Sequence, residues 1–356
     1  MNTSSSAAEN RSQLLARLFP EGVPKLWCPA LTHYERDGRI DPQRIAAHLR
    51  HMSANVKGFL ILGSTGDGWE LSKSEKKQLL AIALHQAQSL KFHLLIGELE
   101  PAKDEALRMI WDRINWLKTY DPFEDRFEGA MIDSLTKARV CGFAVCPPSG
   151  NDVSQPEMER HFELVLESGI PTALYQLPQV TKNEISPELA SSLAARFNNF
   201  IMFKDSSGAD RVVSSGKELG GVFMVRGTEG NYARWLKMAG GSYDGFLLST
   251  ANCFAKELHQ MIIDLLEGRA KAANEMSERL TATVSAVFEL VSPFPDGNAF
   301  ANANKAMDHF FAHGPKAATV PPPRLHAGSS LPTEMIVQTG KILERYDLMP
   351  GKGYFV

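Results

Sequence analysis

The sequence has little of what metal centres, disulfide frameworks and nucleic-acid surfaces require. It contains four cysteines, none of them in a Cys-x-x-Cys pair, and no histidines cluster at the spacing of metal ligands. The 38 Lys and Arg residues are interspersed with 41 Asp and Glu residues, for a formal net charge of −3. We therefore expect no metal ion, no disulfide framework and no nucleic-acid partner.

Long apolar segments are lacking as well. No apolar run reaches the ~18 residues that a membrane span needs, and the N-terminal segment Met1–Ser6 is not a basic stretch followed by an apolar core. With 44% hydrophobic and 22% charged residues, the composition is typical of a globular chain. We expect a cytoplasmic protein without a membrane partner.

What the sequence does contain is a repeated alternation of short apolar runs, turn residues and helical patterns. The runs are Leu26–Pro29, Phe59–Leu62, His93–Gly97, Phe143–Cys146, Thr172–Tyr175, Ile201–Lys204, Phe223–Arg226 and Gly245–Leu248. Such alternation is typical of parallel βα units. Eight units favour an α/β fold of the (β/α)8 TIM barrel type over an open doubly wound sheet.

The lengths of the connections predict the domain organisation. The third and fourth runs end at Gly97 and Cys146, the largest interval, which indicates an insertion at about 111–136. Its aromatic residues suit a lengthened helix, a lid or an oligomer contact. Further helical patterns follow the eighth run. We expect an N-terminal extension (1–23), the barrel (24–266) and a C-terminal helical region (267–356).

Two residues at predicted strand ends carry reactive groups. Lys204 ends a wholly apolar run, and burial in the barrel mouth would disfavour its charged form, leaving an amine able to attack a ketone. Tyr175 ends another run and has a phenol able to transfer a proton. Taken singly, these residues are better explained as a lysine that reaches solvent and as an aromatic residue at the barrel rim.

Loops after other runs carry groups suited to anions. The segment from Gly63 to Gly68 contains three glycines at its ends and centre, with Ser64 and Thr65 between them. Backbone N–H groups and hydroxyls of this kind suit a carboxylate, although a tight strand-to-helix turn has the same composition. The segments 226–230 and 244–252 follow or surround the last two runs and could shape a pocket.

Together and in order, these segments resemble the family of dihydrodipicolinate synthase and N-acetylneuraminate lyase. Its members share a Gly-Ser/Thr-Thr-Gly-Glu loop, a Tyr-Asn-x-Pro strand end and a Lys-Asp-Ser-Ser-Gly strand end, and the similarity spans roughly residues 24–255. The resemblance implies a (β/α)8 barrel with a C-terminal helical part and a homo-oligomer, tetramer or dimer. It also implies a lysine that forms an imine with pyruvate, without any cofactor.

The resemblance assigns roles to particular residues. Lys204 corresponds to the Schiff-base lysine, Tyr175 to the proton-transferring phenol and Ser64 to the hydroxyl that relays protons. The positions that it implies for substrate binding are Gly63, Thr65, Gly227, Glu229, Leu247 and Ser249.

Departures from the family pattern narrow the expected substrate. The segment 179–181 reads Gln-Val-Thr where the synthases carry the arginine that binds the second substrate, which argues against dihydrodipicolinate synthesis. The segment 146–149 reads Cys-Pro-Pro-Ser and lacks the family's relay tyrosine, so that Ser149, water or another group must move the proton. Gln176 and Asp67 replace the family's Asn and Glu.

We therefore expect a Schiff-base lyase, an aldolase or dehydratase, that acts on pyruvate and a 2-oxo-3-deoxy sugar acid or similar hydroxylated 2-oxo acid. Ser249 falls where sialic acid lyases place a sugar-contacting serine, but Glu229 is only one of the two acids that they carry nearby. Two alternatives stay open. One is dihydrodipicolinate synthesis, and the other is a non-catalytic binding protein for a 2-oxo acid.

Overall fold

The computed structural model describes residues 3–100, 102, 105–120 and 130–355. Eight strands form one closed barrel, in the order in which they occur along the chain. They are β1 (Leu26–Pro29), β2 (Gly58–Ile61), β3 (His93–Gly97), β4 (Val140–Val145), β5 (Thr172–Gln176), β6 (Phe200–Asp205), β7 (Phe223–Arg226) and β8 (Gly245–Leu247). The predicted (β/α)8 barrel is confirmed, and every predicted run overlaps one strand.

The chain divides into two compact units. The first comprises Met1–Lys25, His93–Thr228 and Ser242–Phe246, and the second comprises Leu26–Phe92, Glu229–Gly241 and Leu247–Val356. The predicted division into an N-terminal extension, a barrel and a C-terminal helical region stays a prediction.

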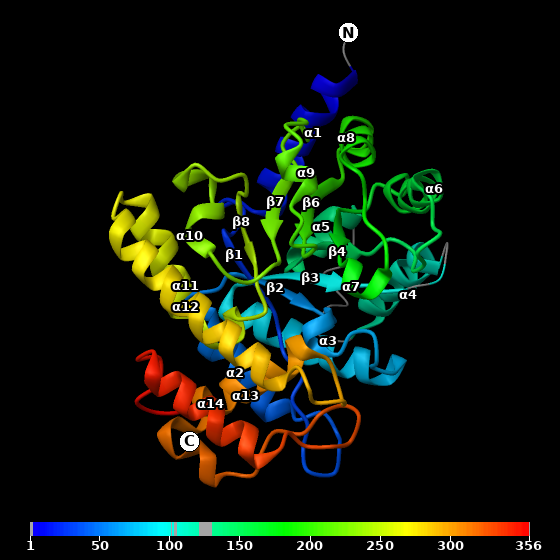
Figure 1. Cartoon of the computed structure of the whole chain (residues 1–356). Helices are drawn as coiled ribbons and strands as arrows, with labels where there is room; N and C mark the ends of the chain where they lie inside the picture. The colour runs from blue at the N-terminus through cyan, green and yellow to red at the C-terminus, as the bar shows by residue number, and fades with distance from the viewer. Residues whose placement is uncertain (1–2, 101, 103–104, 121–129, 356) are drawn as a thin grey trace. The chain divides into compact units, whose positions relative to one another are not determined.

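In the first unit, helices alternate with the strands β3 to β7 (Figure 1). Ser154 is the N-cap of α6, where Glu157 Oε2 accepts from the backbone N–H of Ser154 at 3.0 Å. The helices are α1 (Thr3–Leu18), α4 (Glu105–Thr119), α5 (Met131–Lys137), α6 (Gln155–Leu166), α7 (Pro178–Thr181), α8 (Pro187–Arg196) and α9 (Arg211–Ser214). Of the predicted insertion, residues 121–129 lie outside the described residues.

Helix α1 is bound to the first unit by a buried arginine. The guanidinium of Arg11 donates to the backbone carbonyl of Phe200 in β6 and to that of Phe197 at the end of α8, at 2.8 and 2.7 Å. Burial lowers the pKa of Arg11 to about 10. The N-terminal helix is thus fastened to β6, the strand that carries Lys204.

In the second unit, the last four helices pack on one another and are coloured from yellow to red in Figure 1. Helix α13 is buried over nearly its whole surface, as expected for a helix enclosed by other helices. The helices are α2 (Pro42–Ser53), α3 (Lys73–Leu90), α10 (Tyr232–Trp235), α11 (Ala251–Leu266), α12 (Ala270–Val291), α13 (Ala299–His313) and α14 (Thr333–Arg345). Among all helices in the described part of the chain, none has the length and apolarity needed to cross a membrane.

Candidate active site

In the first unit, the strand-end lysine lies against the strand-end tyrosine. Strands β5 and β6 are parallel, and their register places Tyr175 directly beside Lys204. Both side chains are buried, with exposed fractions of 3% and 4%. The Nζ atom of Lys204 lies 3.8 Å from the centroid of the Tyr175 ring. The structure therefore brings together the two groups that the sequence predicts for imine formation and proton transfer.

Gly227, which follows β7, leaves the space that the lysine side chain occupies. Its N–H donates to the carbonyl of Asp205 at 2.6 Å, which holds the two backbones close together. A Cβ atom at this position would lie 2.1 Å from Ser206 Oγ and 3.0 Å from Lys204 Cε. A side chain at position 227 would therefore displace the amine.

We expect Gly227→Ala to weaken imine formation at Lys204 by about tenfold or more, because misplacing a reacting group by about 1 Å costs rate of this order. The measurement is the fraction of protein trapped by borohydride at a fixed pyruvate concentration. Gly351→Ala is the matched control, because a Cβ there meets no atom within 4 Å. Equal trapping in the two variants would contradict the assigned role of Gly227.

A buried polar network occupies the opposite side of the same strands. Because side chains alternate along a strand, Gln176 and Asp205 point away from their neighbours Tyr175 and Lys204. Gln176 Nε2 donates to Asp205 Oδ1 at 3.3 Å, and the hydroxyl of Tyr243 donates to Asp205 Oδ2 at 3.4 Å. Burial raises the pKa of Asp205. The replacement of the family's Asn by Gln176 thus alters this supporting network rather than the surroundings of the amine.

The segment that lacks the family's relay tyrosine carries a buried thiol and an exposed hydroxyl. Burial raises the pKa of the Cys146 thiol, and the nearby Lys204 acts in the opposite direction. Asn183 fastens the segment, since its Nδ2 donates to the carbonyls of Pro148 and Gly150. Ser149, between them, faces solvent. A thiol held protonated by burial is a poor proton acceptor at neutral pH.

In the second unit, the loop after β2 forms a short 3-10 turn (Ser64–Gly66). A tight turn at this point is one of the two interpretations of its glycine-rich composition. Ser64 and Thr65 are buried. Asp67 accepts hydrogen bonds from the Tyr34 hydroxyl at 2.8 Å and from Lys305 Nζ of α13 at 3.0 Å. The acid that replaces the family's Glu therefore fastens this loop to the C-terminal helices.

Two of the predicted substrate-binding residues, Glu229 and Ser249, bind each other. Glu229 Oε1 accepts from Ser249 Oγ at 2.7 Å and from the backbone N–H of Thr250 at 3.1 Å. Its other oxygen accepts from the hydroxyls of Thr250, at 2.6 Å, and Tyr232, at 3.0 Å. Ser249 thus gives its hydrogen to the carboxylate and keeps the lone pairs of its oxygen for another donor.

The predicted site residues fall into groups within the two units. Lys204, Tyr175 and Gly227 lie together in the first unit. Gly63, Ser64 and Thr65 share the loop after β2 in the second unit, where Leu247 is buried in β8 and Ser249 contacts Glu229. Four hydrogen-bonding partners of these loops were not expected from the sequence: Tyr232 and Thr250 at Glu229, Lys305 at Asp67, and Trp69, whose indole donates to Ser64. Of these, only Thr250 had a signal, as a hydroxyl beside Ser249 after a strand.

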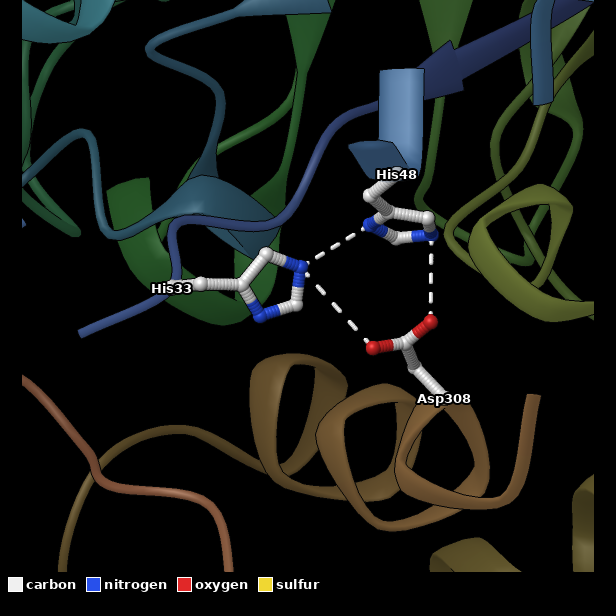
Figure 2. Close-up of side chains that lie close together, drawn as sticks. All are labelled: His33, His48 and Asp308. Carbon is white, nitrogen blue, oxygen red and sulfur yellow. Dashed lines mark hydrogen bonds and ion pairs between the residues drawn. The ribbon is translucent and has the colours of Figure 1, made fainter. Parts of the chain in front are cut away.

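A cluster of two histidines and an acid lies elsewhere in the second unit, although their sequence spacing shows no sign of it (Figure 2). His33 Nε2 lies 2.9 Å from His48 Nδ1. His48 Nε2 lies 3.2 Å from Asp308 Oδ1, and His33 Nε2 lies 3.8 Å from Asp308 Oδ2. All three side chains are buried, a donor set of the kind that also occurs at metal centres.

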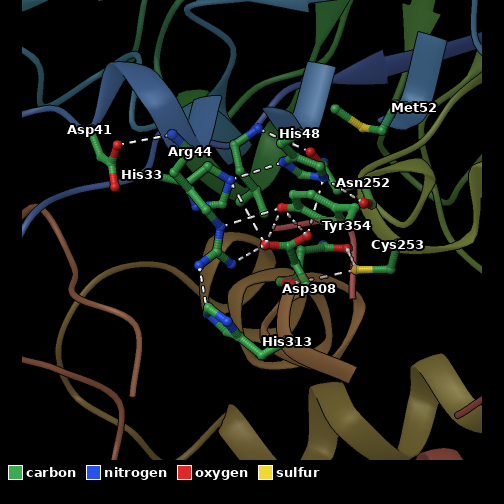
Figure 3. Close-up of polar contacts among 12 residues, drawn as sticks. His33, Asp41, Arg44, His48, Met52, Asn252, Cys253, Asp308, His313 and Tyr354 are labelled. Carbon is green, nitrogen blue, oxygen red and sulfur yellow. Dashed lines mark hydrogen bonds and ion pairs between the residues drawn. The ribbon is translucent and has the colours of Figure 1, made fainter. Parts of the chain in front are cut away.

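Protein groups already satisfy this donor set, as Figure 3 shows. Arg44 Nη2 donates to Asp308 Oδ2 at 2.7 Å, and the Tyr354 hydroxyl donates to Asp308 Oδ1 at 2.9 Å. His48 Nε2 donates to the Asn252 carbonyl at 2.7 Å, so its Nδ1 accepts from His33. The positive charge that balances Asp308 is therefore the Arg44 guanidinium. The cluster joins α2, α13 and the C-terminal segment.

Buried histidines make the stability of the protein depend on pH. Burial lowers the pKa of His33 and His48, and burial and then Arg44 lower that of His313 to about 4. As the pH falls below about 6.5, the unfolded chain takes up protons that the folded chain does not bind. The contribution of these histidines to the free energy of unfolding is therefore fully present above this pH and is lost progressively below it.

We expect the free energy of unfolding to fall from pH 7.5 to pH 5, with up to about 1.4 kcal/mol per pH unit for each such histidine. Urea unfolding at several pH values measures it. His313→Gln should reduce the slope, whereas His85→Gln, on the exposed face of α3, should not. A stability that does not change over this range would refute the assignment.

Comparison with known proteins agrees with this fold. The model of the dihydrodipicolinate synthetase family matches residues 131–297, which include β4 to β8. The 4-hydroxy-tetrahydrodipicolinate synthase of Thermotoga petrophila is 21% identical over 266 residues, 73% of this chain and 82% of that protein. The enzyme of the same name from Buchnera aphidicola is 24% identical over 248 residues, 69% of this chain and 75% of that protein.

Solved structures are similar over nearly the whole chain. The E. coli prophage protein YagE, of the dihydrodipicolinic acid synthase family and in complex with pyruvate, has a TM-score of 0.68 at 20% identity. The similarity covers 91% of this chain and 99% of that one. Dihydrodipicolinate synthase from Thermotoga maritima has a TM-score of 0.68 at 16% identity, covering 92% and 99% of the two chains. At these identities the structural likeness shows the fold.

The closed barrel defines the fold, and the comparisons define the class of protein, a (β/α)8-barrel lyase of the class I, pyruvate-dependent type. Both the family model and the curated relatives agree with this class. These comparisons support a similarity to the dihydrodipicolinate synthase and N-acetylneuraminate lyase family, and the low identities fit a divergent relative.

Proposed function

We propose that this protein is an aldolase or dehydratase that holds a pyruvate-type 2-oxo acid as an imine on Lys204 and acts on hydroxylated 2-oxo acids such as 2-oxo-3-deoxy sugar acids. The observation that carries the proposal is the position of the buried Lys204 Nζ, 3.8 Å from the centre of the Tyr175 ring. A buried amine loses the hydration that favours its charged form. The neutral amine, which is the nucleophile, is therefore favoured by burial.

The chemistry follows from the imine. The amine nitrogen of Lys204 attacks the ketone carbon, water leaves, and a protonated C=N bond forms. In aldol cleavage the C3–C4 bond breaks, its electron pair enters the iminium to give an enamine, and the C4 hydroxyl loses its proton as the aldehyde forms. Protonation of the enamine at C3 and hydrolysis then release pyruvate. We assign these proton transfers to the Tyr175 phenol.

The residues of the second unit support a substrate that carries both a carboxylate and hydroxyl groups. We assign Gly63, Ser64 and Thr65 to the carboxylate, because buried hydroxyls and glycine N–H groups suit an anion. Ser249 donates its hydrogen to Glu229, so its oxygen can accept a hydrogen bond from a substrate hydroxyl. We assign Leu247 to the apolar wall of the pocket.

Dihydrodipicolinate synthesis, the activity after which the curated relatives are named, is the alternative. The segment Gln179–Thr181 weighs against it, because it holds no cationic side chain for a second carboxylate. Gln179 instead donates to the carbonyl of Ser206 at 3.0 Å, and Val180 is an exposed apolar residue. The non-catalytic alternative draws support from the relay segment, where Cys146 is buried and Ser149 faces solvent.

A screen for pyruvate release over a panel of hydroxylated 2-oxo acids tests the proposal. We expect at least one 2-oxo-3-deoxy sugar acid to release pyruvate or to lose water, with pyruvate acting as a competitive ligand. Condensation of pyruvate with aspartate semialdehyde as the preferred reaction would favour the synthase. Imine trapping without turnover on every compound would favour the binding protein.

We also propose a homo-oligomer, a dimer or tetramer, as the family resemblance implies. Light scattering coupled to gel filtration would measure the mass of the assembly against the 39.3 kDa of one chain.

A further inference from the structure

The loop that carries Ser64 also supplies a hydrogen-bond partner for the Ser64 side chain. The indole Nε1 of Trp69 donates to Ser64 Oγ at 2.6 Å. Ser64 is buried and Trp69 is half-buried. The carbonyl of Ser64 accepts separate hydrogen bonds from Asp67 N and from Asn298 Nδ2. Among the described residues, the Trp69 indole is therefore the group that hydrogen-bonds to the Ser64 hydroxyl.

The chemistry of the indole determines what the hydroxyl can do. An indole N–H is a donor only, so Ser64 Oγ must be the acceptor in this hydrogen bond. The single hydrogen of the Ser64 hydroxyl is then directed elsewhere, toward another acceptor. The indole does not ionise in the ordinary pH range and has no lone pair to receive a proton. Trp69 consequently cannot pass a proton onward from Ser64, as a tyrosine in its place could.

The rest of the loop holds this geometry in place. The N–H groups of Gly66 and Gly68 both donate to the carbonyl of Gly63 at 3.0 Å. Thr32 Oγ1 donates to the carbonyl of Gly66 at 2.7 Å. Position 68 has to be glycine, because a Cβ there would lie 1.9 Å from the carbonyl oxygen of Leu62. A loop fixed at its backbone keeps the Ser64 hydroxyl in one orientation relative to the indole.

We propose that Trp69 is a positioning residue that directs the hydroxyl hydrogen of Ser64 toward an oxygen of the bound 2-oxo acid. The proposal rests on the function proposed above. It goes beyond that function because it assigns a role to a residue outside the family's motifs. It also makes the contribution of Ser64 one of binding, so that loss of Trp69 affects half-saturation more than turnover.

The test is the pyruvate concentration that gives half-maximal borohydride trapping on Lys204, measured for the full-length protein and three variants. For Trp69→Phe we expect an increase of about threefold to tenfold, as for the loss of one hydrogen bond. For Ser64→Ala we expect at least as large an increase. The double variant should match Ser64→Ala, because Trp69 acts only through the Ser64 hydroxyl. Turnover at saturating substrate should change less than half-saturation.

Trp111→Phe is the matched control, because Trp111 is an exposed tryptophan on α4 and its replacement should leave half-saturation unchanged. If Trp69→Phe does not fold, Trp69→His keeps a ring N–H and should lie nearer to the wild type than Ser64→Ala does. The proposal is overturned if Trp69→Phe, or Trp69→His in its place, binds pyruvate no differently from the wild type while Ser64→Ala does. Multiplicative effects in the double variant would also overturn it. An absence of trapping in the wild type at saturating pyruvate would instead refute the Schiff-base function itself.

Discussion

Replacing Lys204 by alanine is expected to abolish imine formation with pyruvate and to lower turnover by about three orders of magnitude or more, as removal of a covalent nucleophile does in other enzymes. The expected result follows from the buried position of the amine beside Tyr175. Borohydride reduction with pyruvate should add the mass of the trapped ligand to the peptide that contains residue 204 in the wild type alone. Retained activity in Lys204→Ala would overturn the mechanism.

Two further variants sharpen this experiment. Lys217→Ala removes an exposed lysine of the first unit and should leave both trapping and turnover unchanged. Tyr175→Phe keeps the ring against Nζ but removes the phenol. It should still trap pyruvate while losing about 10²-fold to 10⁴-fold in turnover, the usual contribution of a positioned proton-transfer group. A Tyr175→Phe variant with normal turnover would assign the proton transfer to another group.

Replacing Asp308 by asparagine is expected to lower the free energy of unfolding by about 3–5 kcal/mol. The carboxylate is buried and accepts from Arg44 at 2.7 Å, so the variant leaves a buried guanidinium without its counter-charge. Urea unfolding monitored by circular dichroism measures the change. Asp37→Asn, which removes an exposed carboxylate beside Arg39, should have no measurable effect. A change below about 1 kcal/mol in Asp308→Asn would contradict the role assigned to the cluster.

The same variant should also change the response to acid. Burial would raise the pKa of Asp308, but the neighbouring His48, the Arg44 guanidinium and His33 outweigh this effect and hold the pKa well below its usual range. The carboxylate therefore contributes stability above its unfolded pKa of about 3.9, and this contribution is lost as the pH falls toward the folded pKa. Asp308→Asn should consequently lose less stability than the wild type below about pH 4.

The strands illustrate how much local pattern can predict. The ends of β1, β3 and β7 agree with the predicted runs, and β7 is followed directly by a glycine, Gly227. Strand β4 begins at Val140, three residues ahead of the predicted start. Gly142 interrupts the apolar pattern there, and its positive φ of 152° lets the chain continue in the strand while the carbonyl of Pro171 lies close by. In the sequence, a glycine that permits close packing within a strand is therefore easily mistaken for a turn residue.

Contacts between residues that are far apart in the sequence cannot be predicted from local pattern. Nothing near Asp67 in the sequence indicates that its counter-charge is Lys305, 238 residues further along the chain. His33 and His48 are 15 residues apart, and only the packing of α13 brings Asp308 to them. Such pairings depend on which helix faces meet. Many interhelical arrangements satisfy the same apolar periodicity equally well.

The sequence by itself determined the class of fold, the strand ends that carry Lys204 and Tyr175, and the resemblance to a family, because strand period and short motifs are local properties of the chain. The tertiary structure alone decided how these groups are supported. It brought the Trp69 indole within hydrogen-bonding distance of Ser64, Ser249 within hydrogen-bonding distance of Glu229, and the Arg44 guanidinium into an ion pair with Asp308. The physical reason is that a buried polar group must find a partner, and which partner it finds depends on how the elements pack.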